Sequence, residues 1–512
     1  MKCNFTSTLL LCTLFPSWLQ GQEKPNIVYI MADDLGYGDL SCYGAKLIST
    51  PNIDKLAAQG RSFTDAHSVS SVSTPSRYAF LTGSYPYRYN NGEGCWRPLR
   101  INHPLLISEN QKTLAEKLKE NGYSTACIGK WHLGFQRRDT TDWNKPLRPG
   151  PIDVGFDYYF GLPLVSSGPP FVYVENDTVY GYEKNDPLIY NGYPISETQK
   201  YEAKGINRFS GGKKAHSLYK DDEVAVEFVT RSKNWIKDNK EKPFFLLLAT
   251  THIHHPFTSG KKFRGSSKCG LYGDYVQEFD WMVGEIMRTL KEENLEKNTL
   301  LIVTSDNGGM LNLSAQRAWR TGHRINGDLF GFKFGIWEGG HRIPFIVRWP
   351  EKIEANSYSN QLISNVDMFA TFVALAGGKL NNEEAPDSYN VLEAFIGNPK
   401  IPLRNHLILA PNKSSHLSYR KGDWIFIPAQ GGGGWNNDKG NAMGGVLSTK
   451  FTNKFNSDIY NGKIKSNAPK CQLFNLKEDI CQKVNLADNE SALLQEMRNE
   501  FLEKKKLKKT RE

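Results

Sequence analysis

Carboxylates and an amide stand directly after two apolar runs of the chain. Asp33 and Asp34 end the run KPNIVYIMADD, and Asp306 and Asn307 follow TLLIVTS. All four side chains offer oxygen atoms, which hard cations such as Ca²⁺ or Mg²⁺ prefer, whereas a zinc site would include His or Cys. The four residues therefore predict a site for a hard cation, although a solvated turn explains Asp33 and Asp34 equally well when that pair is taken alone.

Basic and imidazole side chains stand at similar places. GKWHLG places Lys130 and His132 two residues apart after an extended segment, where both would project to the same side. HIHHP puts His254 beyond another apolar run, and FKFGIWEGG carries Lys333 shortly before a Gly-Gly turn. Each motif is weak alone, because such residues are more often structural than catalytic.

The stretch SVSTPSRYAFLTG has the signals of a helix that begins near a serine. Pro75 suits an early helical position, and Gly83 suits the end of the helix. A helix N-terminus favours anions such as sulfate or phosphate, and Arg77 can reach the same anion. The alternative is that Ser73 or Thr74 only caps the helix.

Apolar runs alternate with helical patterns along the first 400 residues. This alternation predicts an α/β sandwich with a large, mostly parallel central sheet flanked by helices, and ligands bind such sheets outside the carboxyl ends of the strands. The candidate residues follow the predicted strands, so the sheet would bring them together. The clearest predicted strands are 24–34, 124–129, 243–252 and 299–309, and the clearest helices are 113–122, which opens with a Thr113–Glu116 capping box, 274–295 and 364–378.

The pattern changes from about residue 401. The runs HLILA, LSYRKGDWIFIPA and KCQLFNL predict short antiparallel strands, and SALLQEMRNEFLEKKKL predicts a helix. A Gly- and Asn-rich loop at 430–445 interrupts them. We therefore expect a catalytic domain over 22–400 and a smaller α+β domain with an antiparallel sheet over 401–512.

The first 21 residues have the pattern of a cleaved export signal. Lys2 precedes the apolar stretch FTSTLLLCTLF, and Gly21 suits the last residue before cleavage. The stretch is too short to span a bilayer, and no later segment is long and apolar enough to do so. These features predict an exported protein with no transmembrane segment.

Composition and cysteine spacing exclude several classes of protein. A hydrophobic content of 39% in 512 residues argues against wholesale disorder. The cysteines form no C-x-x-C pair, which argues against a zinc finger or a thioredoxin-like site; Cys471 and Cys481 are the nearest pair for a disulfide. The net charge of +10 suits an anionic partner, but no nucleic-acid motif accompanies it, so nucleic acid is not an expected partner.

The motifs, taken together, resemble those of one family. The segment STPSR that begins at Ser73, with the LTG that follows it, resembles the signature of the type I sulfatases, the formylglycine-dependent family. ADDLGYGDLSCYG, GKWHLG, the His-x-Pro at His254, SDNGG and FKFGIWEGGHRIPFIVRWP stand in the family's order. The resemblance spans residues 24–490 and departs at Ile480 and Cys481, where the family has Asp-Pro. It implies an alkaline-phosphatase-like sandwich.

The resemblance also implies the metal and the nucleophile. Asp33, Asp34, Asp306 and Asn307 would hold one Ca²⁺ together with residue 73. Ser73 would be oxidised after translation to formylglycine, and one hydroxyl of the hydrated aldehyde would attack sulfur while Asp306 accepts its proton. Expulsion of sulfate would then need the second hydroxyl, which a plain serine lacks.

The remaining candidates would handle protons and charge. His254 and Lys333 would contact the substrate and protonate or stabilise the leaving sugar oxygen, and His132 would take the proton of the second hydroxyl. Arg77 and Lys130 would neutralise the charge on the sulfate oxygens.

The most similar branch contains arylsulfatase A and N-acetylgalactosamine-6-sulfatase. It implies exo-acting removal of sulfate from galactose or N-acetylgalactosamine in mucin or glycosaminoglycan fragments, with the 6-, 4- and 3-positions all open. Loops at 94–103, 166–177, 317–324 and the Gly-rich loop are candidates for the sugar pocket. Serine at 73 resembles a bacterial variant matured by an oxygen-independent radical enzyme, which implies the periplasm or cell surface of an anaerobic bacterium.

Two other interpretations remain open. A phosphatase or phosphodiesterase of the same superfamily would use two zinc ions and would need His where this chain has Asn307. A sulfoglycan-binding protein without turnover would result if Ser73 stayed unmodified.

Overall fold

The computed structural model of the protein describes residues 24–138, 140–190, 209–436 and 442–511, so the predicted export signal at 1–21 lies outside the described residues. No helix in the described part is long and apolar enough to cross a membrane.

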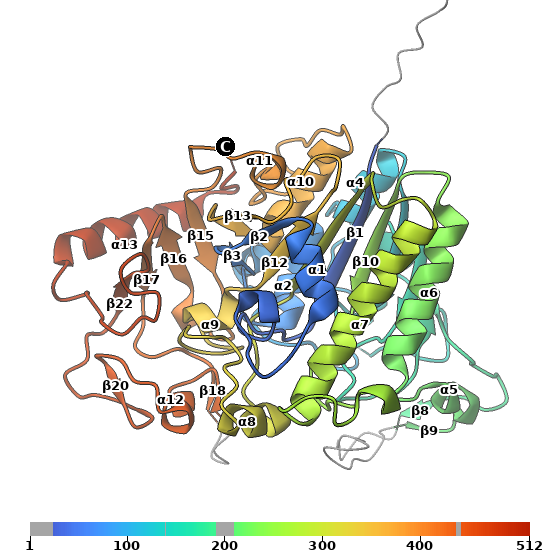
Figure 1. The fold of residues 1–512 in the computed structure, drawn as a ribbon, viewed down its shortest axis with the longest axis horizontal. Helices are drawn as coiled ribbons and strands as arrows, with labels where there is room; N and C mark the ends of the chain where they lie inside the picture. The colour runs from blue at the N-terminus through green and yellow to red at the C-terminus, as the bar shows by residue number, and fades with distance from the viewer. Residues whose placement is uncertain (1–23, 139, 191–208, 437–441, 512) are drawn as a thin grey trace, which may run out of the picture.

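A ten-stranded sheet forms the centre of the described part of the molecule (Figure 1). Its middle strands β11 (Thr299–Ser305), β1 (Asn26–Ala32), β10 (Phe244–Ala249) and β4 (Ser124–Gly129) pair in this order and run parallel, as the sequence predicted. Their carboxyl ends therefore lie at one edge of the sheet. The full order is β13 (Ser357–Ser359), β2 (Arg61–Phe63), the antiparallel strand β12 (Phe345–Arg348), β11, β1, β10, β4, β5 (Tyr158–Gly161), β6 (Val174–Glu175) and β7 (Thr178–Val179).

Helices cover both faces of this sheet because successive side chains of a strand point to opposite faces. In β1, Tyr29 belongs to the hydrophobic core that contains Phe80, and Ile30 belongs to the core that contains Met282. The first core is covered by α2 (Ser73–Thr82), α4 (Leu114–Glu120), α10 (Met368–Leu375) and α11 (Leu392–Ile396), and the second by α1 (Pro51–Ala58), α6 (Val224–Asn239), α7 (Leu271–Glu292) and α8 (Leu313–Arg320). Shorter helices are α3 (Tyr89–Gly92), α5 (Lys213–Leu218) and α9 (Glu338–His341).

The predicted capping box of α4 is confirmed. The Thr113 hydroxyl accepts a hydrogen bond from the Glu116 backbone N–H at 3.1 Å, and the Glu116 carboxylate accepts one from the Thr113 N–H at 2.8 Å. Two otherwise unpaired donors of the first turn are thereby satisfied, which is why the helix begins at this point.

The C-terminal part contains a smaller antiparallel sheet, as predicted. Leu407 and Phe426 of this sheet share one hydrophobic cluster with Val69 and Trp337 of the large part, so the two parts have a common core. The boundary at residue 400 stays a prediction. The sheet comprises β15 (His406–Leu409), β16 (Ser418–Lys421), β17 (Trp424–Ile427) and β22 (Gln472–Asn475), with helices α12 (Leu447–Thr452) and α13 (Ser491–Lys506) beside it. Two-stranded pairs are β3 (Ala66–His67) with β14 (Ile363–Ser364), β8 (Ile189–Tyr190) with β9 (Phe209–Ser210), β18 (Trp435–Asn436) with β19 (Ala442–Met443), and β20 (Ile459–Tyr460) with β21 (Lys463–Ile464).

The cysteines of the described part all carry free thiols. Cys471 is buried and Cys481 is half-buried, and they do not form the disulfide that their spacing allowed. Packing and hydrogen bonds, rather than a covalent bridge, therefore hold the C-terminal sheet in place.

Candidate active site

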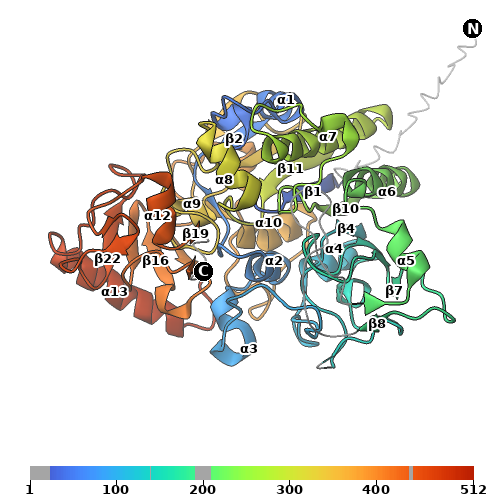
Figure 2. The same ribbon diagram turned by 90° about the horizontal axis from the view of Figure 1, so that it is seen from below.

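Three carboxylates meet at the carboxyl edge of the parallel strands, the edge that faces the viewer in Figure 2. Asp33 and Asp34 follow β1, and Asp306 follows β11, its neighbour in the sheet. One ligand atom from each lies within 4.8 Å of the others, and all three side chains are buried. The Asp34 backbone N–H donates to Asp306 Oδ1 at 3.2 Å, which ties the two strand ends together.

Ser73 lies against this cluster at the first residue of α2. Its hydroxyl lies 3.1 Å from Asn307 Oδ1 and 3.3 Å from Asp33 Oδ1, both possible acceptors for its single proton. Asn307 in turn donates its amide to Asp34 Oδ1 at 2.8 Å. The capping alternative is wrong for Ser73, because Val72 occupies the N-cap position and no side chain caps the helix.

Three cations balance the three carboxylates, each by a separate ion pair. Arg77 Nη2 lies 2.8 Å from Asp306, Lys130 Nζ lies 2.8 Å from Asp33, and Lys333 Nζ lies 2.6 Å from Asp34. Such pairing is required because buried charges are stable only when they are compensated.

The two lysines respond differently to burial. Burial lowers the pKa of Lys130 to about 8, although the Asp33 carboxylate opposes the change. Burial also acts to lower the pKa of Lys333, but the surrounding carboxylates, Asp34 first, outweigh it and raise the pKa above its ordinary value. Lys333 Nζ also lies 3.4 Å from the Ser73 hydroxyl, so a cation stands directly beside the candidate nucleophile.

The histidines sit at the ends of β10 and β4. His254 places Nε2 4.0 Å from Asp34 Oδ2, and its Nδ1 lies 2.7 Å from the His255 carbonyl oxygen. Since a carbonyl only accepts, Nδ1 carries a proton, and Nε2 is the nitrogen that faces the carboxylate cluster. Burial first, then the neighbouring positive charges, lowers the pKa of His254 and of His132 well below the ordinary value.

The Lys130-x-His132 segment does not have the extended backbone conformation that the sequence predicted. β4 ends at Gly129, whose φ is 120°, and His132 has a φ of 59°, so the segment is not extended. The His132 backbone oxygen accepts a hydrogen bond from the Thr74 hydroxyl at 3.2 Å, which fixes the segment against α2. His132 Nδ1 is buried and has no partner among the described residues.

The carboxylate cluster has the properties of a cation site. Its donors are all oxygen atoms, which suits Ca²⁺. Asp34 Oδ2 is buried without a hydrogen-bond partner among the described residues, an arrangement that costs free energy unless a further group binds there. The residues present therefore fit a hard cation.

A second group with metal-ligand residue types lies elsewhere. His67, Glu338 and His341 are buried together. The two imidazoles lie 3.0 Å apart through their Nδ1 atoms, and Glu338 pairs with Arg342 at 2.7 Å. Hydrogen bonds and an ion pair engage all three side chains, and of their polar atoms Glu338 Oε1 alone has no hydrogen-bond partner among the described residues.

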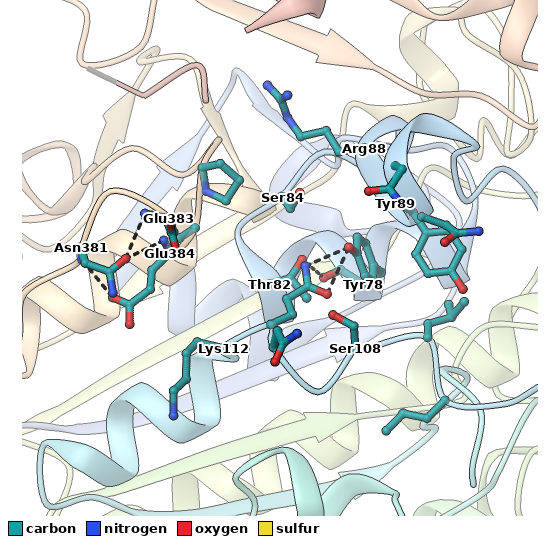
Figure 3. Close-up of a pocket in the computed structure, with 18 of the residues that line it drawn as sticks. Tyr78, Thr82, Ser84, Arg88, Tyr89, Ser108, Lys112, Asn381, Glu383 and Glu384 are labelled. Carbon is teal, nitrogen blue, oxygen red and sulfur yellow. Dashed lines mark hydrogen bonds between the residues drawn. The ribbon is translucent and has the colours of Figure 1, made fainter. Parts of the chain in front are cut away.

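A polar pocket of about 630 Å³ lies near the second half of α2 (Figure 3). It is lined by Tyr78 and Thr82 and not by Ser73. Tyr78 is hydrogen-bonded to Gln111, and Arg88 is paired with Asp387, so these two side chains already have polar partners. This pocket is separate from the cluster around the serine.

The stretch 317–324, a candidate for the sugar pocket, makes local contacts: Arg324 lies over the ring of Trp319, and His323 pairs with Asp39 at 2.7 Å. Its role in sugar binding stays a prediction. Sequence reasoning missed His255, whose ring stacks on His254 at 4.4 Å, and Asn412, which follows β15. The doubled histidine in HIHHP was a signal for His255, whereas no local pattern points to Asn412.

The fold and the site are those of a hydrolase of the alkaline-phosphatase-like class, with a buried hydroxyl at a helix N-terminus beside an all-oxygen cluster that could hold a cation. Residues 25–378 match the sulfatase family model, so the chain belongs to the sulfatase family and is a sulfuric ester hydrolase. It is 40% identical to an N-acetylgalactosamine-6-O-sulfatase of Bacteroides thetaiotaomicron over 80% of this chain and 83% of that protein. The rat N-acetylgalactosamine-6-sulfatase is 33% identical over 73% of this chain and 66% of that protein.

A solved structure supports the same assignment. A Bacteroides thetaiotaomicron protein, studied in work on the metabolism of multiple glycosaminoglycans, superposes with a TM-score of 0.81 at 35% identity. The superposition covers 94% of this chain and 99% of that one. The predicted fold and enzyme class are thereby confirmed.

Proposed function

We propose that the protein is an exported, exo-acting carbohydrate sulfatase that removes the 6-sulfate from terminal N-acetylgalactosamine of glycosaminoglycan or mucin fragments. The two relatives named for that sugar support this choice over galactose and over the 4- and 3-positions. The observation that carries the proposal is the position of Ser73, whose hydroxyl lies beside Lys333, Asp33 and Asn307 at the N-terminus of α2.

Asp33, Asp34, Asp306 and Asn307 are the residues that would hold Ca²⁺. The bound cation would supply charge stabilisation and a lower pKa for a hydroxyl at position 73. Oxidation of Ser73 to formylglycine, followed by addition of water to the aldehyde, would supply two hydroxyls at position 73. One would attack sulfur, and loss of the proton from the other would expel sulfate and re-form the aldehyde. A radical-type maturation enzyme, acting before the protein reaches the periplasm or cell surface, is the proposed source of this oxidation.

The cations of the site would receive the sulfate group. Arg77 and Lys130 present fixed positive charge beside Asp306 and Asp33, and the N–H groups of the first turn of α2 add partial positive charge. Because these groups are buried and already in place, they neutralise charge on the sulfate oxygens without reorganisation.

The two histidines would divide the proton transfers. With Nδ1 donating to the His255 carbonyl, His254 can carry a second proton only at Nε2, and burial opposes that proton in the free protein. The negative charge of a bound sulfate would favour it, and the proton would then pass to the departing sugar oxygen, assisted by Lys333. His132, kept neutral by burial and by Lys130, would accept a proton from the hydroxyl at position 73.

Two measurements on protein from its native host test the proposal. The tryptic peptide 62–77 should weigh two hydrogen atoms less than its sequence requires and should react with a hydrazine, and the protein should release sulfate from N-acetylgalactosamine 6-sulfate. An unmodified serine would remove the proposed nucleophile and leave a sulfoglycan-binding protein as the better interpretation. If Ser73 is oxidised but the protein releases only the 4- or 3-sulfate, the proposed sulfate position alone would be wrong.

Metal analysis separates the proposal from the phosphatase alternative. We expect one Ca²⁺ per chain because the cluster contains only oxygen donors, with Asn307 at the position where a two-zinc site would need His. Two zinc ions per chain, with phosphate ester turnover, would contradict the proposal.

A further inference from the structure

A cleft of about 560 Å³ lies between a loop of the large part of the molecule and a segment of the C-terminal part. One wall is the loop that carries Gly94, Trp96 and Arg97, and the other is the segment 412–415. Its volume lies within the range of about 300–1,000 Å³ typical of ligand pockets. In Figure 2, α3, from which the first wall continues, lies beside the C-terminal part.

Both walls connect directly to the candidate active site. On the first wall, the Leu99 backbone N–H donates to the hydroxyl of Thr74, the neighbour of Ser73, at 3.1 Å. On the second, the Asn412 N–H donates to the carbonyl of Phe334, the neighbour of Lys333, at 3.3 Å. The cleft is therefore held in a fixed relation to both sides of the nucleophile.

Asn412 places in the cleft a side-chain oxygen that has no hydrogen-bond partner among the described residues. The side chain of Asn412 is 4% exposed, and the oxygen without a partner is its Oδ1. A buried polar atom without a partner costs free energy, so it indicates that a further polar group binds there.

The cleft is also positively charged. Arg97 and Lys413 are exposed at its two walls, and no carboxylate is among the described residues that line it. The nearest acid in sequence, Glu93, has its carboxylate turned to the Asn90 amide at 2.5 Å. The half-buried ring of Trp96, whose Nε1 donates to the Glu93 carbonyl at 2.8 Å, adds a rigid apolar surface of the kind that sugars stack on.

We propose that this cleft binds the sugar next to the one that loses sulfate, and that it selects a neighbour carrying an anion, either a carboxylate or a second sulfate. Arg97 and Lys413 would attract the anion from opposite walls, and Asn412 Oδ1 would accept a hydrogen bond from a sugar hydroxyl. This inference rests on the proposed sulfatase function and assigns to its substrate an acidic neighbouring sugar, as found in glycosaminoglycans.

The test compares three disaccharides with the mature enzyme. Each has terminal N-acetylgalactosamine 6-sulfate, linked to glucuronate, to a sulfated hexose, or to a neutral hexose. The wild type should show a kcat/KM about tenfold higher for an anionic neighbour than for the neutral one. Arg97→Gln and Lys413→Gln should each lower that ratio about threefold, and the double variant should bring it close to one. The anionic arm with the higher kcat/KM identifies the anion.

Lys352→Gln is the matched control. It removes the same charge from an exposed position that follows β12, which is antiparallel to β11 and therefore ends at the opposite edge of the sheet. This variant should keep the wild-type ratio. An equal kcat/KM for all three disaccharides, or a ratio that survives in the double variant, would overturn the inference.

A binding measurement separates this inference from the proposed function. Calorimetric titration of Ser73→Ala protein with a chondroitin 6-sulfate tetrasaccharide needs no turnover. Adding Arg97→Gln and Lys413→Gln to the Ser73→Ala protein should raise the Kd for the tetrasaccharide about fivefold. If the wild type does not release sulfate from any N-acetylgalactosamine 6-sulfate substrate, the proposed function is wrong. The titration still tests the proposed role of the cleft, because an unchanged Kd in the triple variant would refute that role.

Discussion

At the scale of single residues, the site consists of a serine surrounded by buried charges of both signs. Three buried carboxylates face three buried cations, and the serine hydroxyl touches members of both sets. A substrate sulfate would enter with its own negative charge and so take over part of the attraction that the carboxylates now exert on Lys130 and Lys333. On the proposed function, the cation of each of these ion pairs would also be a point of contact for the substrate.

His254→Ala should lower kcat for sulfate release by about 10²–10⁴-fold, because the leaving oxygen would lose its proton donor. The fold and any bound Ca²⁺ should persist, since the ring makes one hydrogen bond within the described part of the chain, to the adjacent His255 carbonyl. His216→Ala, in α5, serves as a control of the same chemistry away from the site. Near-normal kcat in His254→Ala would exclude this residue from the mechanism.

Most site residues were predictable because the strand-end rule needs only the local pattern. Asp33, Asp34, Asp306 and Asn307 each follow an apolar run, and a parallel sheet brings such ends together. The conformation of Lys130-x-His132 was not predictable, because Gly129 ends the strand with a positive φ, and no pattern in the sequence indicates that φ. Asn412 joins the site region through a long-range contact with Phe334.

At the scale of elements, the ends of β1 and β11 carry three like charges that one cation would hold together. Removing Ca²⁺ with a chelator should lower both the activity and the melting temperature, because a ligand that binds only the folded state adds about 2.7 kcal/mol at 100 times its Kd. Sulfate release and thermal unfolding, followed with and without restored Ca²⁺, check this. An unchanged melting temperature would contradict a cation site at these strand ends.

The capping box makes a second prediction at this scale. Thr113→Ala should destabilise the protein by about 0.5–2 kcal/mol, because the Glu116 N–H loses its acceptor at the start of α4. The same hydroxyl donates to the Val154 carbonyl at 2.6 Å, which places the expected loss in the upper part of that range. Thr178→Ala, at an exposed position of β7, should change the unfolding free energy by less than about 0.5 kcal/mol in denaturant titrations.

At the scale of the whole molecule, the sequence indicated two parts but not how they join. The change in pattern near residue 401 correctly predicted the antiparallel sheet. It did not predict the shared core, in which Trp337 of the large part packs with residues of the small sheet. Periodicity reports which face of an element is buried, but it does not report what covers that face.

Arg404 joins the two parts and makes the last prediction. Its guanidinium pairs with buried Asp367 at 2.5 Å and donates to the Tyr85 hydroxyl at 2.9 Å, all within the protein interior. Arg404→Met keeps most of the apolar volume but leaves the Asp367 carboxylate without its counter-ion, which should cost about 3–5 kcal/mol. Calorimetry should show one unfolding transition at a lower temperature, because the parts share a core.

The exposed Arg148, which pairs with Asp153 on the surface, provides the matched control. Arg148→Met removes the same group where water can replace the lost interaction, so its melting temperature should stay close to that of the wild type. Two separate transitions in Arg404→Met, with the larger one at the wild-type temperature, would show that the C-terminal part folds on its own. In that case the boundary near residue 400 would divide two independent domains, and the cleft between them would be free to open.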